Sequence, residues 1–233
     1  MVIKYSYLIQ FPFGFKAYRD VPFTFYYEFI YQLKRLTCIN IERKCEDCIL
    51  KDACIYFHLT GKNFAYYPGI LVKRDFVEKK NYAPNEKVTL NFYLFPSLLQ
   101  YEGYLTGFFE TKNMIREHLF QILDFKKENL ELHDIKTDKI KILNPISEID
   151  CIKEQIVYYN QNYDTSFNDE IEIKPIQIRK IIDQNRYQIQ NYRFQFSGEV
   201  GTFQVVNWNN ILLEIGVGKT NFVGGGVGIE NQD

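Results

Sequence analysis

Residues 216–229 read Gly-Val-Gly-Lys-Thr-Asn-Phe-Val-Gly-Gly-Gly-Val-Gly-Ile, and this segment holds six of the chain's 13 glycines. Glycine adopts positive φ without steric cost and lets another group approach the backbone closely. Backbone N–H groups in such a loop, beside a lysine such as Lys219, form a cradle for phosphate oxygens. The sequence therefore predicts a phosphate-binding loop; the alternative is a mobile glycine-rich tail.

Two common phosphate-binding motifs do not fit this segment. A Walker A loop needs a glycine five residues before Gly218, and Leu213 occupies that place. Both that loop and the dinucleotide fingerprint need a long helix and further strands, whereas only 13 residues follow Thr220. The glycines therefore belong to a different kind of loop, located at the end of the chain.

The preceding residues give the loop a context. A strand-like segment ends in Phe196-Ser197-Gly198, a second strand-like segment follows, and a short apolar segment (211–215) leads into the glycines. This order resembles the C-terminal signature of CRISPR-associated RAMP proteins, specifically the family that cuts CRISPR repeat RNA. The resemblance implies two tandem ferredoxin-like (RRM-like) halves and RNA contacts from Gly216, Gly218, Lys219, Thr220, Gly224 and Gly226.

Four of the five cysteines lie within 17 residues, as Cys38-x₆-Cys45-x₂-Cys48-x₅-Cys54. In a chain expected to be cytoplasmic, such crowding favours a metal site over disulfides. Four thiolates suit a structural Zn²⁺ ion, and an iron–sulfur cluster uses the same donors. Reduced, metal-free cysteines are the remaining alternative.

The cysteines also support the resemblance. A branch of the repeat-cleaving endoribonucleases carries a cysteine-rich insertion after its first helix. Here the expected insertion spans residues 38–60 and closes with Cys54-Ile-Tyr56-Phe-His-Leu59, in the style of that branch.

The resemblance further implies a metal-independent ribonuclease in which a general base, usually His, activates the ribose 2′-OH. Residues 24–44 contain no His, so this chain departs from the family pattern. His58 is nearest to the expected place and is the candidate base, with Tyr31 and Lys34 as helpers. A metal ligand or an ordinary packed histidine is the alternative for His58. Catalysis by positioning alone, through Tyr, Lys or Arg groups, is another alternative.

Net charge is −1, so any RNA must follow a local basic stripe. Residues 174–193 contain five basic residues and one acidic residue, interleaved with Gln, Asn and Tyr. Such residues bind phosphates and bases. This segment predicts RNA contacts from Arg179, Lys180, Arg186 and Arg193; the alternative is a solvated strand face.

The hydrophobic pattern predicts an α+β chain. Residues 2–11 alternate as a strand, residues 23–36 show helical spacing, and residues 87–95 form a second strand. We expect a hairpin from 118–125 and 130–135, and a linker or long loops between units over 144–169. The expected domains are 1–140, which contains the cysteine insertion, and 141–233, which contains the glycine loop.

No apolar run is long enough for a transmembrane helix, and the N-terminus lacks the pattern of a signal peptide. We therefore expect a cytoplasmic protein with no membrane partner and no cofactor required for catalysis. The leading hypothesis is a CRISPR repeat RNA endoribonuclease. The alternative is a non-catalytic RNA-binding RAMP subunit of a CRISPR effector complex, in contact with other subunits. A zinc-stabilised protein unrelated to RNA is a distant third.

Overall fold

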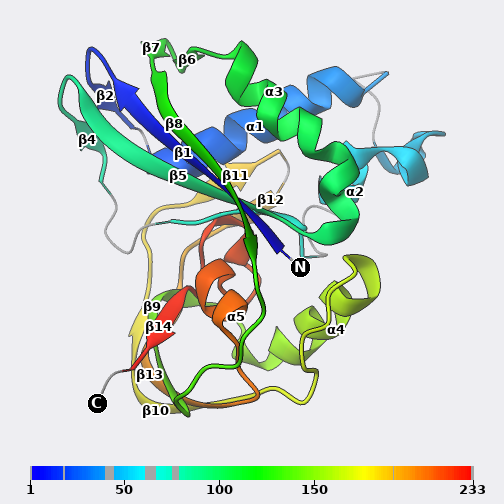
Figure 1. Ribbon diagram of the computed structural model, residues 1–233, viewed down its shortest axis with the longest axis vertical. Coiled ribbons are helices and arrows are strands. Elements are labelled where there is room, and N and C mark those ends of the chain that lie inside the picture. Colours follow the sequence, from blue (N-terminus) through cyan, green and yellow to red (C-terminus); the bar gives the residue numbers. More distant parts are fainter. Residues whose placement is uncertain are drawn as a thin grey trace.

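The computed structural model describes residues 2–17, 19–39, 45–60, 67–74, 79–190 and 192–231. Its first half contains a four-stranded antiparallel sheet in the spatial order β3-β5-β1-β8. The strands are β1 (Val2–Phe11), β3 (Ile70–Val72), β5 (Glu86–Leu94) and β8 (Gln121–Leu130). Helices α1 (Val21–Thr37) and α3 (Glu102–Thr111) connect them (Figure 1). This order of strands and helices is the ferredoxin-like arrangement.

The core of this half follows from the alternation in β1. Tyr5, Tyr7 and Ile9 are buried, and the intervening side chains lie on the opposite face. Helix α1 begins at the N-cap Asp20, whose carboxylate accepts a hydrogen bond from the Phe23 N–H at 2.7 Å.

Aromatic side chains join the helices of this half to its sheet. On β5, Phe92 packs edge-on against Phe29 of α1 and against Phe109 of α3. Both helices therefore cover the same face of the sheet.

The second half repeats the arrangement. Its antiparallel sheet has the order β10-β13-β9-β14, formed by β9 (Lys139–Ile146), β10 (Glu172–Ile181), β13 (Gly198–Val206) and β14 (Gly228–Glu230). The connecting helices are α4 (Ile152–Asn162) and α5 (Asn210–Ile215). A hairpin of β11 (Tyr187–Ile189) and β12 (Tyr192–Phe194) is inserted between β10 and β13. The expected tandem ferredoxin-like fold is therefore confirmed.

Shorter elements complete the chain. They are β2 (Phe15–Lys16), β4 (Asn81–Tyr82), β6 (Met114–Ile115), β7 (His118–Leu119), α2 (Ile55–Thr60) and the 3₁₀ turns η1 (Cys45–Asp47), η2 (Lys51–Ala53), η4 (Pro96–Tyr101), η5 (Ile149–Cys151) and η6 (Asn221–Val223). Within the described ranges, no helix combines the length and apolar character needed to cross a bilayer.

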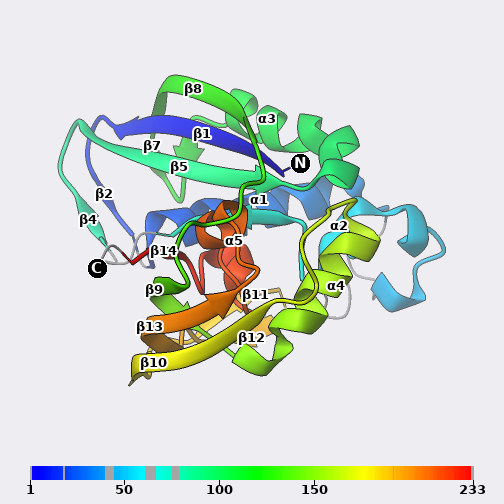
Figure 2. The same ribbon diagram turned by 60° about the horizontal axis from the view of Figure 1, so that its bottom comes forward.

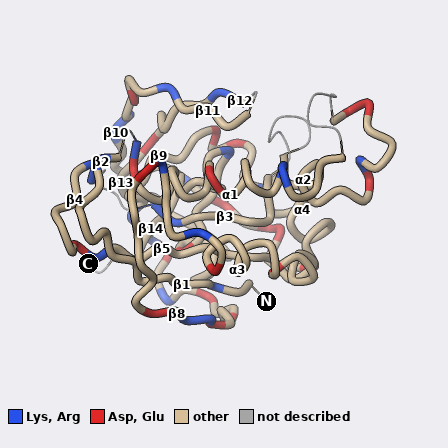
Figure 3. The backbone as a smooth tube through the Cα atoms, turned by 90° about the horizontal axis from the view of Figure 1, so that it is seen from above, with Lys and Arg blue, Asp and Glu red and all other residues tan. Residues whose placement is uncertain are grey.

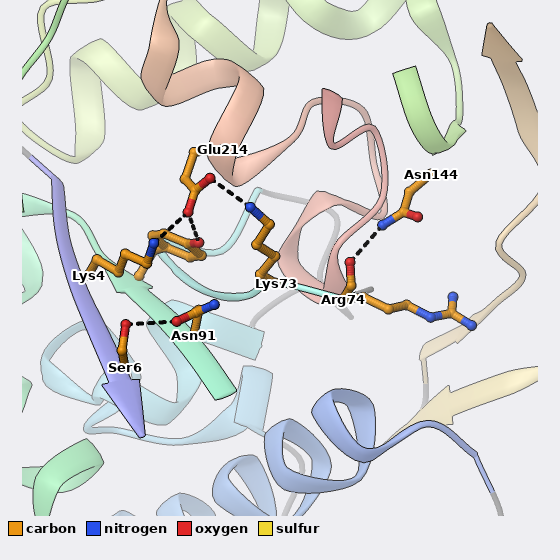
Figure 4. A network of polar contacts seen from close by, with 8 residues as sticks. Lys4, Ser6, Lys73, Arg74, Asn91, Asn144 and Glu214 are labelled. Carbon is orange, nitrogen blue, oxygen red and sulfur yellow. Dashed lines mark hydrogen bonds and ion pairs between the residues drawn. The ribbon is translucent and has the colours of Figure 1, made fainter. Parts of the chain in front are cut away.

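Helix α5 lies between the two sheets, as Figures 1 and 2 both show. Its Glu214 carboxylate accepts hydrogen bonds from Lys4 Nζ at 2.8 Å, Lys73 Nζ at 2.6 Å and the Tyr93 hydroxyl at 2.7 Å (Figure 4). Burial opposes ionisation of Glu214, but the hydrogen bonds from both lysines outweigh it and hold its pKa at about 2. This cluster ties the second half to the first sheet.

A second link between the halves centres on Arg74. Its guanidinium pairs with the buried Asp20 carboxylate at 3.0 Å and donates to the Tyr187 hydroxyl at 3.1 Å. The Asn144 amide donates to the Arg74 carbonyl at 2.9 Å and to the Gly224 carbonyl at 2.7 Å. Arg74 therefore connects the start of α1 to the β11–β12 hairpin and to the glycine-rich loop.

Two sequence expectations are wrong. Residues 144–169 are not a linker, because they contain α4, which buries Ile152, Ile156 and Tyr159. The exposed residues of α4 are rich in Asn and Gln, so its short apolar stripe is difficult to recognise in the sequence. The expected hairpin at 118–135 does not form: residues 118–119 are β7, which pairs with β6, and residues 121–130 are the single strand β8, which pairs with β1. The polar residues of β8 do not interrupt it, because nearly all of this edge strand is exposed.

The expected division into domains 1–140 and 141–233 stays a prediction. The first strand of the second half, β9, begins at Lys139, close to that boundary.

Candidate functional site

A groove of about 580 Å³ lies between α1 and the β11–β12 hairpin. Among the residues that the structure describes, four separate parts of the chain line it, and none of these lining residues is acidic. The lining consists of Arg19 just before α1, of Phe23, Tyr27 and Tyr31 of α1, of Arg116 of the β6–β7 turn, and of Arg186, Gln188 and Gln190 of the hairpin segment. Three guanidinium groups around one cavity provide the positive charge and the hydrogen-bond donors that suit an anion.

The alternation of β11 determines which hairpin side chains reach the groove. Tyr187 and Ile189 are buried, so the residues between and beside them point the other way. Gln188 pairs in register with Arg193 of β12, and side chains of directly paired residues share a face. Arg186 and Arg193, both predicted RNA contacts, therefore belong to the groove side of the hairpin. Figure 3 shows basic positions along this hairpin.

The other two arginines were not predicted from sequence. Arg19 donates hydrogen bonds to the Asn185 side chain at 3.1 Å and to the Arg186 carbonyl at 2.8 Å, so it braces the hairpin. Arg116 lies 5.5 Å from the centre of the Tyr27 ring and 3.9 Å from the Glu28 carboxylate. Neither arginine stands in a recognisable motif. Only the fold brings them together.

The remaining predicted basic residues lie elsewhere. Arg179 and Lys180 are exposed on β10, an edge strand, and neighbouring residues of a strand point to opposite faces. Neither lines the groove.

The three predicted catalytic residues are not gathered at one place. Tyr31 lines the groove and is 47% exposed. Lys34, one turn further along α1, lies with Nζ 5.9 Å from the Tyr56 ring centre, beside the cysteines. His58 lines a different pocket, of about 150 Å³, and packs edge-on against Tyr163. Burial lowers the pKa of His58 below its usual value.

The other histidines also lie outside the groove. His118 packs edge-on against Phe15 at 4.9 Å between ring centres, and His133 is exposed beside Glu131. No histidine lines the groove within the described ranges.

The glycine-rich loop is packed inside the protein. Gly216, Gly218, Gly224 and Gly226 are all buried and all have positive φ. A Cβ on Gly226 would collide with the Val217 carbonyl oxygen. The other three positions are equally closed by neighbouring protein atoms: the Gly225 carbonyl, the Ser147 carbonyl and the Arg74 backbone. Packing within the protein therefore accounts for the glycines; contact of the loop with RNA stays a prediction.

Lys219 is the exposed residue of this loop. Its ammonium pairs with the Glu148 carboxylate at 2.5 Å, and this hydrogen bond raises the pKa of Lys219. Thr220 is buried, with its hydroxyl 3.4 Å from that of Ser147. Glu148 adopts left-handed backbone geometry (φ 55°), so the partner of Lys219 sits on a strained turn.

The four clustered cysteines line one small pocket, and all are reduced and half-buried. Burial raises the pKa of the Cys45 thiol, while nearby Lys34 opposes the effect. Within the described residues, no three His, Cys, Asp or Glu side chains are placed to hold a metal ion. The donor chemistry suits zinc, but this arrangement does not supply its coordination geometry. The metal site stays a prediction.

The chain was compared with protein families, with curated proteins and with solved structures. No protein-family model matches the chain, and no curated protein matches it in sequence. Three solved structures match over nearly all of both chains: a RAMP protein described as binding different RNA substrates (15% identity, TM-score 0.56), a Cas6-related protein from Pyrococcus furiosus (13%, 0.56) and a Cas6 product complex (10%, 0.55). They cover 98–100% of this chain, and 99–100% of their own length is matched. The chain therefore has the fold of the CRISPR-associated RAMP and Cas6 proteins.

Proposed function

We propose that this protein binds CRISPR repeat RNA and cleaves it as a metal-independent endoribonuclease. The observation that carries the proposal is the arginine-lined groove on a tandem ferredoxin-like fold. The likeness to the RAMP and Cas6 structures extends over the whole chain and supports the same function. Arginine suits this role because its planar guanidinium binds phosphate oxygens through two parallel hydrogen bonds.

The proposed reaction needs no metal ion. A base takes the proton of the ribose 2′-OH, and the oxygen attacks the adjacent phosphorus. The bond from phosphorus to the 5′-oxygen breaks, and that oxygen receives a proton. The products are a 2′,3′-cyclic phosphate and a 5′-OH end. In this proposal, Arg116 and Arg186, which line the groove, stabilise the charge that develops on the phosphate.

His58 and Tyr31 define two versions of this chemistry. In the first, RNA extends from the groove to His58, which acts as the base; Lys34 assists. In the second, Tyr31 and the arginines align the 2′-OH within the groove, and no histidine takes part. The low pKa of His58 favours its neutral form near pH 7, as a base requires.

A cleavage assay separates these versions. We expect single-site cleavage of a cognate repeat RNA in EDTA, and none when the scissile nucleotide carries a 2′-deoxy sugar. If His58 is the base, His58→Ala cleaves about 10²–10⁴-fold more slowly with unchanged binding. The rate of the wild-type protein then falls on acidification with a midpoint below 6.5, because the base must be neutral and its pKa is lowered. A normal rate in His58→Ala assigns catalysis to the groove; cleavage that needs a metal ion would refute the proposed mechanism.

The second candidate function is a non-catalytic RNA-binding subunit of a CRISPR effector complex. The absence of histidine among the described lining residues of the groove favours it. Tight binding of repeat RNA with no cleavage of any phosphodiester would support this function over the enzyme.

We also propose that Lys219 contacts an RNA phosphate at the edge of the glycine-rich loop. It is exposed, and a phosphate would replace Glu148 as its partner. The buried glycines hold the loop in shape, and direct RNA contact from Gly216, Gly218, Gly224 and Gly226 stays a prediction.

A further inference from the structure

We propose that the groove binds unpaired nucleotides, with a base stacked on Tyr31 and base edges read by Gln188 and Gln190. This inference rests on the proposed RNA-binding function and names the form of RNA that the groove takes. Its physical basis is the arrangement of aromatic, amide and guanidinium groups around one cavity.

The α1 wall of the groove is an aromatic stripe. Phe23, Tyr27 and Tyr31 are spaced by four residues, which places them on one face of the helix with a repeat of about 6 Å. Arg116 lies over the Tyr27 ring, and Phe23 packs edge-on against Tyr187. Tyr31 is the most open of the three, and its ring has no aromatic or cationic partner within the described parts of the chain. An exposed tyrosine ring at the end of such a stripe is a stacking surface for a base.

The hairpin wall carries hydrogen-bonding groups at a matching repeat. Arg186, directly before β11, and Gln188 within it are alternate residues about 6.6 Å apart along the hairpin. Gln190 lies in the turn after β11, where its φ is 53°, and also lines the groove. Glutamine has an acceptor and two donors, the combination needed to bond the edge of a base. The Gln188 amide donates one N–H to the Gln190 carbonyl at 2.7 Å, which leaves its second N–H and its side-chain oxygen for a base. The two walls therefore present stacking groups and edge-reading groups to successive positions of an extended strand.

The arginines complete the site. The Arg186 side chain is exposed directly before β11, while its own carbonyl is held by Arg19. Arg116 closes the other side, above Tyr27. Phosphates of the strand are then bound at the margins and bases in the middle. Paired RNA hides its base faces within the stack and displays mainly phosphates and 2′-hydroxyls, so it cannot use the tyrosine or most of the glutamine contacts.

The test compares an unstructured RNA decamer with a blunt RNA hairpin of similar composition. Binding is measured by fluorescence anisotropy with 2-aminopurine at successive positions of the decamer. We expect the wild-type protein to bind the decamer more tightly and one 2-aminopurine position to be quenched. Tyr31→Leu should weaken decamer binding about 5- to 150-fold and abolish that quenching. Tyr31→Phe should keep both, since the ring is retained.

Matched glutamine variants complete the experiment. Gln188→Ala should lower discrimination among bases at one position, whereas Gln177→Ala, on the exposed strand β10, should change nothing. If RNA binds but Tyr31→Leu affects decamer and hairpin equally, or neither, the unpaired-nucleotide site is refuted and the RNA-binding function stands. If the wild-type protein binds neither RNA, the proposed function itself fails. An unchanged melting temperature of Tyr31→Leu shows that the exposed ring is not needed for folding.

Discussion

Replacement of Glu214 by glutamine should loosen the junction between the two halves in a pH-dependent way. The wild-type carboxylate accepts hydrogen bonds from Lys4, Lys73 and Tyr93, and its side chain is only 26% exposed. Its pKa falls from 4.5 to about 2 on folding. Because one pKa unit corresponds to about 1.4 kcal/mol, the ionised form contributes about 3 kcal/mol to stability at most.

The sign of the pH dependence follows from the lowered pKa. The contribution is complete above pH 4.5 and is lost as the pH falls toward 2. We expect Glu214→Gln to reduce the free energy of unfolding by about 3 kcal/mol at pH 7 and by about 1.4 kcal/mol at pH 3. Urea unfolding followed by circular dichroism and by the fluorescence of Trp208, the single tryptophan, measures both values.

The control is Glu172→Gln, which removes an exposed carboxylate paired with Lys174 on the same strand. Exposed pairs contribute little, so this variant should unfold like the wild-type protein at both pH values. A Glu214→Gln variant as stable as the wild-type protein at pH 7, or equally destabilised at both pH values, would show that the carboxylate is not held as the structure indicates.

The other predictions concern the loop and the cysteines. Gly226→Ala should lower the melting temperature sharply, because φ is positive and the Cβ meets the Val217 carbonyl; Gly107→Ala, with open space in α3, should stabilise the protein by about 1 kcal/mol. Equal melting temperatures for the two variants would contradict the packing of the loop. Lys219→Ala should weaken repeat-RNA binding and flatten its salt dependence by roughly one phosphate contact, whereas Glu148→Gln should strengthen binding by freeing Lys219. Unchanged dissociation constants for both variants would remove Lys219 from the interface. Metal analysis should find about one ion per chain, and Cys45→Ser should lose it with several kcal/mol of stability; metal-free protein with unaltered stability in the variant would rule out the site.

Local sequence patterns were enough for the first strand and the first helix of the fold. Alternation in residues 2–11 and helical spacing in residues 23–36 depend only on which side chains must avoid water, and both elements form as expected. The second ferredoxin-like half was expected from the family resemblance that the segments before the glycine loop carry. Helix α4 was missed because its buried stripe is short and its surface is rich in amides.

The candidate site could not be predicted in the same way, because contacts between residues far apart in the sequence create it. Arg186 belongs to the basic segment recognised in the sequence, but Arg19 and Arg116 are far from it in the chain and stand in no motif. The three arginines meet because the β11–β12 hairpin folds over α1. The same holds for the glycines, whose number was evident in the sequence but whose reason is the closeness of Val217, Ser147 and Arg74. Sequence patterns encode the preference of each segment for water or for a core. Which distant side chains share a cavity depends on the tertiary packing of those segments, and only the structure shows it.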